Sequence, residues 1–289
     1  MWLALAALVG ILVTCVLPFY LVTPTIAIVT AFVIIFYPFK IPWIRRRKLW
    51  ETLRQRLNYT VVSANNTEAN VNREEQLVFA VAPHGPFCLS IMLTWVFETP
   101  TTSRTRRHRE VIPMVAKQLL RVPLLGALCR MHGCQNISSD NFRTQLSNGK
   151  SIAMAPGGAK EAMFSDELVG NRITILRRRS YAWTTHAMFN NTNIIPVLSL
   201  GECSAYRTWR SFRPLQRLCY RLVGYPFPIF IFGAFWSFWP RSDGNVKLVV
   251  GKKIKWNAYD NPQAMADAYY AELERLAIAH NYTITWVEE

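Results

Sequence analysis

The chain has 289 residues, which is enough for one large domain or two small ones. Its 33 lysines and arginines outnumber its 18 acidic residues, giving a net charge of +15, and 51% of its residues are hydrophobic. Such a basic chain could bind nucleic acid or an anionic membrane. It has no zinc-finger spacing, RNA-binding signature or basic zipper, so we exclude nucleic acid. Its six cysteines form no Cys-x-x-Cys pair, so we expect neither a disulfide framework nor a bound metal.

The N-terminal segment is the most apolar part of the chain. Residues 2–39 carry no charge, and Lys40 is the first charged residue. One helix of that length would measure about 57 Å, whereas a bilayer core of ~30 Å needs about 20 residues. Pro24 divides the segment into Trp2–Val22 and Ile26–Phe39, which predicts a membrane-embedded helical hairpin. One tilted span followed by an interfacial segment is the alternative, and the lack of a basic start argues against a cleaved signal peptide.

A basic segment, residues 40–48, follows directly and contains five lysines and arginines. By the positive-inside rule this segment faces the cytosol. We therefore expect a hairpin, residues 1–43, and a cytosolic domain, residues 44–289. Anionic lipid attracts each such side chain by about 1 kcal/mol, so membrane lipid is an expected partner. A secreted or luminal hydrolase is the competing hypothesis, and it predicts a glycan at the sequon of Asn58 or Asn281.

Beyond residue 75, short apolar runs alternate with stretches of helical length. Strands are predicted at Gln76–Ala82, Ser151–Ala155, Ile194–Leu200 and Val246–Val250. Helices are predicted at Leu89–Phe97, Met114–Met131 and Pro262–His280. This alternation predicts an α/β fold with a mostly parallel sheet flanked by helices. Functional sites of such folds gather at the carboxyl ends of the strands.

His84 stands directly after the first of these strands, between Pro83 and Gly85. The two neighbours predict a tight turn, and imidazole is the side chain best suited to proton transfer near neutral pH. A general base of this kind gains roughly 10²–10⁴-fold in rate. We therefore predict that His84 is the catalytic base and that Pro83 and Gly85 shape the binding surface beside it. The other histidines lack this setting: His108, His132, His186 and His280.

A second motif, Pro156-Gly157-Gly158, follows the strand at Ser151–Ala155, and Glu161 comes three residues later. The N–H groups of the glycine pair are candidate donors to an oxyanion, each worth ~3–4 kcal/mol. Glu161 is our candidate for orienting and charge-stabilising the histidine, as a carboxylate does in a catalytic triad. Other carboxylates that could take this role are Asp140, Asp166 and Glu202. Glu202 also follows a predicted strand, so we expect it to line the same site.

Two further segments have two interpretations each. Arg177, Arg178 and Arg179 suit the phosphate groups of a bound substrate or of anionic lipid headgroups, although they could be solvated surface. Residues 225–239 are crowded with aromatic side chains and form either a buried core segment or one that dips into the membrane interface.

Five motifs occur in one order: Pro-His-Gly (83–85), Pro-Gly-Gly-Ala-Lys-Glu (156–161), Arg-Arg-Arg-Ser-Tyr (177–181), Ile-Pro-Val-Leu-Ser-Leu-Gly-Glu (195–202) and Val-Val-Gly-Lys-Lys-Ile (249–254). Together they resemble the diacylglycerol acyltransferase type 2 family, which includes monoacylglycerol and wax-alcohol acyltransferases. The resemblance covers roughly residues 75 to 285, and the N-terminal hairpin is similar too. Two positions depart from the pattern. Ala82 replaces the first histidine of His-Pro-His-Gly, and Leu89 stands where related glycerolipid acyltransferases have an aspartate.

The resemblance implies transfer of a fatty acyl group from acyl-CoA to an acylglycerol or alcohol hydroxyl, without a further cofactor. It places the protein at the endoplasmic reticulum membrane or lipid droplet, with its catalytic domain in the cytosol. It also assigns the catalytic histidine to His84 and the motif carboxylate to Glu161. Among acceptors we favour diacylglycerol, which gives triacylglycerol.

Four alternatives remain open from the sequence. The acceptor could be a lysophospholipid, glycerol phosphate or a wax alcohol, or the protein could bind lipid without catalysis. The sequence also leaves the oligomeric state open, and a homo-oligomer is compatible with it.

Overall fold

A computed structural model of the chain describes residues 48–63, 75–85, 87–96, 111–122, 125–164, 171–208, 213–224, 231–232, 240–241 and 245–289. The predicted hairpin, residues 1–43, lies outside these ranges, as does the aromatic segment 225–239 apart from residues 231–232. Within the described ranges, no helix has both the length and the hydropathy that a membrane span requires.

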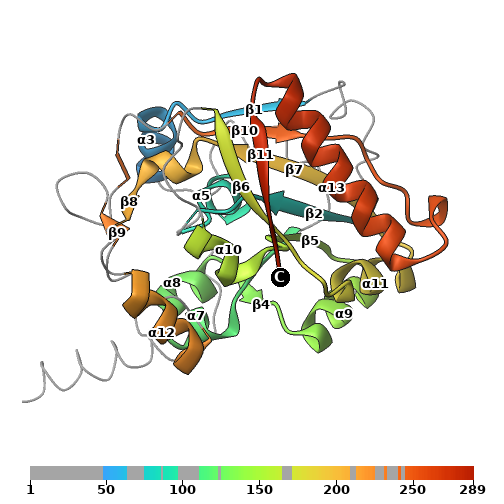
Figure 1. Cartoon of the computed structure of the whole chain (residues 1–289). Coiled ribbons are helices and arrows are strands. Elements are labelled where there is room, and N and C mark those ends of the chain that lie inside the picture. Colours follow the sequence, from blue (N-terminus) through green and yellow to red (C-terminus); the bar gives the residue numbers. More distant parts are fainter. Residues whose placement is uncertain are drawn as a thin grey trace, which may run out of the picture.

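The central element is a seven-stranded sheet (Figure 1). Its strands, in spatial order, are β1 (Thr60–Ser63), β10 (Lys247–Val250), β7 (Asn193–Leu200), β2 (Leu77–Ala82), β5 (Ser151–Met154), β3 (Val111–Val115) and β4 (Gln135–Asn136). The five strands from β7 to β4 are parallel, whereas β10 is antiparallel to β7 and pairs with β1 in parallel. The predicted mostly parallel sheet is thus confirmed, and the four predicted strands lie within about two residues of the observed ones.

Two smaller pairs of strands lie outside this sheet. In one pair, β6 (Arg172–Arg177) and β11 (Thr283–Glu288) run parallel. In the other, β8 (Arg207–Thr208) and β9 (Ile231–Phe232) run antiparallel.

Helices cover both faces of the central sheet (Figure 1). One face packs against α9 (Ser139–Ser147), α11 (Ala182–Phe189) and α13 (Pro262–Ala279). The other packs against α3 (Lys48–Arg56), α5 (Leu89–Ile91) and the π-helical turn η3 (Met92–Val96). The remaining helices are α7 (Lys117–Arg121), α8 (Leu125–Met131), α10 (Gly158–Phe164) and α12 (Arg213–Val223), with short 3₁₀ turns at Glu202–Ala205 and Trp256–Ala258.

Strand β2 shows how the apolar runs build two cores. Val78, Ala80 and Ala82 belong to the cluster that contains α13, while Leu77 and Val81 belong to the cluster that contains α3 and η3. Successive side chains of a strand point to opposite faces, so a strand covered on both faces must be apolar throughout. This explains why the run at 76–82 lacks the polar alternation of a half-exposed strand.

Helix α13 confirms the predicted helix at Pro262–His280. The side chain of Asn261 caps it by accepting a hydrogen bond from the Ala264 N–H at 2.8 Å, and Pro262 occupies its first turn. Both features are typical of helix starts. His280 caps the other end.

The predicted helix Met114–Met131 is wrong in its first part. Met114 belongs to strand β3, and among the described residues of this region only those of α7 and α8 are helical. Proline is common at helix starts, but Pro113 lies inside β3, at a point where β4 pairs only with Met114 and Val115. Proline has no N–H, and it is tolerated at this position because β4 does not extend alongside it to need a hydrogen bond.

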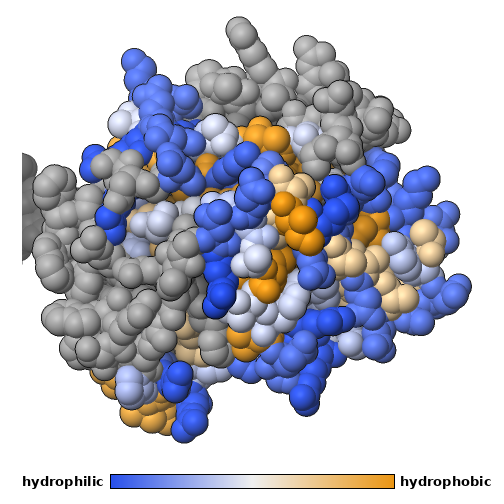
Figure 2. Space-filling view, turned by 45° about the horizontal axis from the view of Figure 1, so that its top comes forward, coloured by the Kyte–Doolittle hydropathy of each residue, from blue (hydrophilic) through white to orange (hydrophobic). Residues whose placement is uncertain are grey.

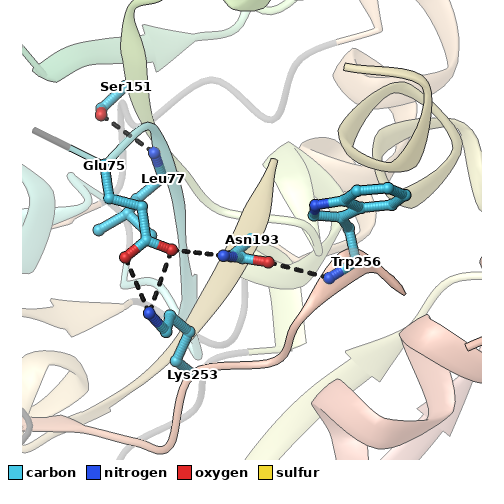
Figure 3. A network of polar contacts seen from close by, with 6 residues as sticks. All are labelled: Glu75, Leu77, Ser151, Asn193, Lys253 and Trp256. Atoms are coloured by element: carbon cyan, nitrogen blue, oxygen red, sulfur yellow. Dashed lines mark hydrogen bonds and ion pairs between the residues drawn. The ribbon is translucent and has the colours of Figure 1, made fainter. Parts of the chain in front are cut away.

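A polar network joins the amino ends of β2 and β7 (Figure 3). The Glu75 carboxylate accepts hydrogen bonds from the Asn193 side-chain amide and from Lys253 Nζ, the latter at 2.8 Å. Asn193 Oδ1 in turn accepts from the Trp256 N–H at 2.9 Å. These contacts fix the sheet at the end opposite to the predicted site, so we assign them a structural role.

Candidate active site

Three of the predicted site segments follow neighbouring parallel strands. His84 comes just after β2, Gly157 after β5 and Glu202 after β7. Because β7, β2 and β5 are adjacent and parallel, their carboxyl ends lie at one edge of the sheet. The fold therefore brings together the residues that the sequence placed at strand ends.

The His84 ring lies between two main-chain carbonyl groups. Its Nδ1 is 2.8 Å from the Gly85 oxygen and its Nε2 is 2.5 Å from the Gly158 oxygen, while the residue is only 8% exposed. A neutral imidazole has one N–H, so it can donate to only one of these two acceptors. The ring is thus held across the ends of β2 and β5.

Glu161 contacts the main chain of His84 and not its ring. The fully buried carboxylate accepts hydrogen bonds from the His84 N–H at 3.1 Å and from the Leu176 N–H at 3.0 Å. This differs from the expected triad-like contact, in which a carboxylate orients the imidazole. The Gly85 carbonyl stands beside Nδ1, where that carboxylate was expected.

Gly157 provides the space for this carboxylate. A Cβ atom at residue 157 would lie 2.4 Å from Glu161 Cδ, which is far closer than non-bonded carbon atoms approach. Burial raises the pKa of Glu161, and this effect exceeds the lowering by the nearby His84 and by the two N–H donors. The site therefore holds a carboxylate in surroundings that disfavour its charge.

Glu202 holds the residue that follows the histidine. Its carboxylate accepts hydrogen bonds from the Gly85 N–H at 2.8 Å, from the Ser90 N–H at 3.1 Å and from Ser199 Oγ at 2.9 Å, and the Ser90 hydroxyl also donates to it. Glu161 and Glu202 thus fix two consecutive main-chain amides, those of His84 and Gly85.

Ser90 and Ser199 are site residues that the sequence analysis missed. Each stands inside an apolar run, and both are buried. A serine in a buried strand or helix needs a hydrogen-bond partner. That need is the signal that could have indicated a polar group, here Glu202, between the two segments.

The glycine pair differs in part from the expectation. The Gly158 N–H donates to the Ala155 oxygen at 3.1 Å, and Gly158 adopts a left-handed conformation with φ of 60°. This N–H is therefore used in the turn. The Gly157 N–H has no acceptor among the residues that the structure describes. Pro83 and Pro156 are both buried in the two turns.

Of the three predicted arginines, Arg177 and Arg179 do not reach the histidine in this structure. Arg177 pairs with Asp267 at 2.6 Å, and its guanidinium lies over the Tyr270 ring at 5.3 Å from the ring centre. Arg179 is exposed, beyond the end of β6.

Arg178 and Lys160 form a cation pair beside the glycine turn. Arg178 Nη1 would lie 3.8 Å from a Cβ atom at Gly158. Arg178 Nε and Lys160 Nζ both contact the side-chain carboxylate of Glu289, at 3.2 and 3.7 Å. Arg178 thus lies next to Gly158, whose carbonyl contacts His84, and the Glu289 carboxylate links it to Lys160.

Cys88 lies close to the two carboxylates but is a poor nucleophile. Desolvation of its thiol, together with the charges of Glu202 and Glu161, raises the pKa of Cys88 well above its usual value. The thiolate is the reactive form of cysteine, so a thiol kept neutral is inert near neutral pH. A covalent acyl-cysteine step is therefore not favoured.

The fold has a counterpart among solved structures. It is similar to the crystal structure of a 1-acyl-sn-glycerophosphate acyltransferase from Thermotoga maritima, with a TM-score of 0.50 and 11% sequence identity. The similarity covers 81% of this chain and 79% of that protein. At this identity the comparison supports the acyltransferase-like fold and nothing finer.

Curated relatives point to one group of enzymes. The chain is 24% identical over 247 residues to diacylglycerol O-acyltransferase 1 of Saccharomyces cerevisiae, covering 79% of this chain and 57% of that protein. It is 23% identical over 204 residues to diacylglycerol O-acyltransferase 2A of Umbelopsis ramanniana, covering 66% of this chain and 54% of that protein. The chain therefore spans about half the length of the curated relatives it matches.

The family comparison covers most of the chain. The diacylglycerol acyltransferase family model matches residues 23–277, a range that includes His84, Glu161 and Glu202. Together with the sheet topology and the order of the motifs, this match shows that the chain belongs to the diacylglycerol acyltransferase family.

Proposed function

We propose that the protein is an acyl-CoA-dependent O-acyltransferase whose acceptor is an acylglycerol, with diacylglycerol as the favoured acceptor and triacylglycerol as the product. The observation that carries this proposal is the setting of His84. It is a buried imidazole at the strand-end edge of the sheet, and two buried carboxylates hold the main-chain amides of His84 and of Gly85. Family membership supports the same reaction.

In the proposed mechanism His84 Nε2 is the general base. The mechanism uses the tautomer in which Nδ1–H donates to the Gly85 carbonyl at 2.8 Å, because only this tautomer leaves on Nε2 the lone pair that a base needs. The acceptor hydroxyl takes the place of the Gly158 carbonyl beside Nε2 and gives up its proton as its oxygen attacks the thioester carbon. The carbon–sulfur bond then breaks, and the imidazolium returns the proton to the CoA sulfur. The products are the ester and free CoA, without a metal or further cofactor.

The oxyanion formed in this attack needs a donor near the glycine turn. We assign that role to the Gly157 N–H, since the Gly158 N–H is already bonded to the Ala155 oxygen. A well-placed donor of this kind is worth ~3–4 kcal/mol. Glu161 and Glu202 act as positioning residues, because they hold the main chain of His84 and Gly85 and do not touch the ring.

We further propose that the reaction takes place at the endoplasmic reticulum membrane or lipid droplet, with the catalytic domain in the cytosol. The uncharged segment 2–39, followed by the basic segment 40–48, supports a membrane location with the catalytic domain in the cytosol. The choice of the endoplasmic reticulum or lipid droplet rests on the family resemblance.

A second candidate acceptor carries a phosphate, as in lysophosphatidate. The cation pair of Lys160 and Arg178 beside Gly158 favours it, because an acceptor phosphate needs paired positive charges near the reacting hydroxyl. Against it stands Leu89, at the position where glycerolipid acyltransferases related to this chain have an aspartate. The same two cations are equally suited to a phosphate of acyl-CoA.

The test is an acyl transfer assay with the full chain in microsomes and labelled acyl-CoA. The acceptors are diacylglycerol, monoacylglycerol, a long-chain alcohol and lysophosphatidate. We expect the wild-type protein to form triacylglycerol, and His84→Ala to lower the rate by roughly 10²–10⁴-fold. His280→Ala, at the end of α13, is the matched control and should retain the rate.

Full activity of His84→Ala would refute the assignment of the base. Product from lysophosphatidate alone would establish the second candidate, and no product from any acceptor would favour a lipid-binding protein without catalysis.

A further inference from the structure

Helix α12 has an unusual orientation for an amphipathic helix. Its sequence, Arg-Pro-Leu-Gln-Arg-Leu-Cys-Tyr-Arg-Leu-Val, gathers leucines on one side. Yet Leu215, Leu218 and Leu222 are 42%, 48% and 76% exposed, so this apolar side is not buried in the protein. A surface helix normally turns such a stripe towards the core.

The side of α12 that is covered is a different one. With 3.6 residues per turn, the three leucines fall within about 60° of arc. Gln216, Cys219 and Tyr220, on the adjoining side, are the half-buried residues. The leucines therefore lie to one side of the contact that the helix makes with the protein.

Arginines flank the leucines on their other side. Arg217 and Arg221 are both exposed, and they fall about 60–100° from Leu218 around the helix axis. The lower left of Figure 2, the place of α12 in Figure 1, shows hydrophobic and hydrophilic side chains next to each other on the surface. The exposed half of α12 is thus an apolar stripe with a cationic border.

We propose that this half of α12 lies in the interface of an anionic lipid membrane. The leucines enter the acyl-chain boundary, and Arg217 and Arg221 bind lipid phosphate groups, as in other basic amphipathic helices at membrane surfaces. The uncharged segment 2–39 of the same chain could also cover the leucines, but it has no acidic side chain to pair with the arginines. The charge pattern therefore favours an anionic membrane as the partner.

The position of α12 relates this surface to the candidate active site. Helix α12 contacts α10, the helix that begins at Gly158 and carries Glu161. Its far end abuts α7, because a Cβ atom at Gly224 would lie 3.2 Å from Gln118 Nε2. A membrane in contact with α12 would therefore lie next to the helix that borders the site. The proposal concerns the surface alone, so it does not depend on the acyl transfer reaction.

The test uses the full chain reconstituted in vesicles of phosphatidylcholine and phosphatidylserine, which include a phosphatidylcholine with a diazirine on its acyl chain. After irradiation, lipid adducts are located by peptide mass spectrometry. We expect adducts on Leu215, Leu218 or Leu222. The matched controls are Phe189 on α11 and Ile278 on α13, which are 82% and 67% exposed and should carry none.

Two double variants then test the leucines and the arginines separately. In Leu218→Gln/Leu222→Gln we expect the adduct yield on α12 to fall about tenfold or more, since the apolar contact is lost. In Arg217→Gln/Arg221→Gln we expect a loss of about tenfold that depends on phosphatidylserine and disappears in pure phosphatidylcholine. All four side chains are exposed, so unchanged thermal unfolding should accompany both variants.

Three results would overturn the proposal. The first is a lack of adducts on α12 when other segments are labelled. The second is a chemical cross-link from α12 to residues 2–39, which would show that the chain covers its own helix. The third is a cross-link between two copies through α12, which would make this surface a dimer interface.

Discussion

Replacing Glu161 by glutamine tests whether this carboxylate positions the histidine at a cost in stability. The two carboxylate oxygens each accept one main-chain N–H, from His84 and from Leu176. Glutamine has the same shape but only one acceptor oxygen, so its amide NH₂ must face one of the two N–H groups. We expect the variant to fold and to fill the same buried space, but to lose the hydrogen bond to one of the two main-chain N–H groups.

Two opposing terms set the change in the free energy of unfolding. A hydrogen bond to a charged group contributes about 1.5–3 kcal/mol, and one such bond is lost. A buried ion costs several kcal/mol in desolvation, and this cost is removed. The raised pKa of Glu161 means that desolvation exceeds the gain from His84 and the N–H donors. We therefore expect Glu161→Gln to unfold within about 1 kcal/mol of wild type near pH 7, although most buried substitutions destabilise by more.

Activity should respond far more strongly than stability. A small displacement of a catalytic group can cost up to about 100-fold in rate, so we expect kcat to fall about 10- to 100-fold. The exposed Glu274→Gln on α13 is the control, and it should change neither quantity. Full activity of Glu161→Gln would show that the carboxylate does not position His84.

The pH dependence gives a second reading of the same substitution. The pKa of Glu161 is higher in the folded protein than in the unfolded chain. The stability that the protonated side chain contributes is therefore fully present when the pH is below the pKa of the unfolded chain, and it is lost as the pH rises through the pKa of the folded protein. Wild type should therefore gain stability relative to Glu161→Gln as the pH falls from neutral towards 4.5, the ordinary pKa of a glutamate, as measured by urea unfolding. The reasoning would be refuted if wild type lost stability relative to Glu161→Gln on acidification. It would also be refuted if Glu161→Gln were less stable than wild type by more than about 3 kcal/mol at neutral pH.

Three further substitutions test the surroundings of the site. Glu202→Gln should lower kcat about tenfold or more, because the main-chain amide of either Gly85 or Ser90 loses its acceptor. An unchanged kcat would contradict the positioning role. Gly157→Ala should lower kcat about 100-fold, since its Cβ would lie 2.4 Å from the buried carboxylate carbon of Glu161. Gly251→Ala is the control and should keep full activity, because its Cβ would lie 3.0 Å from the nearest atoms. Equal losses in the two glycine variants would argue against a specific clash. Arg177→Ala should cost at most about 1 kcal/mol in thermal unfolding, because both partners of its ion pair are more than a third exposed, and a larger loss would show a structural role.

The fold could be predicted where the chain is apolar on both faces. β2, β5 and β7 are short apolar runs because helices cover both sides of the sheet, and each was found from its sequence. β6 and β11 were missed because they form a separate pair with polar residues at their ends. The alternating Thr-Ile-Thr-Trp-Val-Glu of β11 was a detectable signal, since period-two alternation indicates a half-exposed strand.

The site could be predicted as a location but not as a set of contacts. The rule for parallel strands brought His84, the glycine turn and Glu202 to one edge of the sheet. The choice between the ring and the main chain of His84 as the partner of Glu161 depends on how α10 leaves the turn at Gly158. Residue spacing contains no information on that angle, and the serines around Glu202 were hidden inside apolar runs.

The arrangement differs from a triad in where the negative charge acts. In a triad the carboxylate touches the ring and stabilises the imidazolium. Here a neutral carbonyl lies beside Nδ1, and the carboxylates of Glu161 and Glu202 hold the two amides on either side of the histidine carbonyl. Removal of a carboxylate should therefore move the imidazole as a whole instead of changing its proton affinity through a direct bond. An aspartate at residue 161 would keep the charge but, being one carbon shorter, could not reach both amides. If Glu161→Asp loses as much activity as Glu161→Gln, the reach of the carboxylate matters and not only its charge.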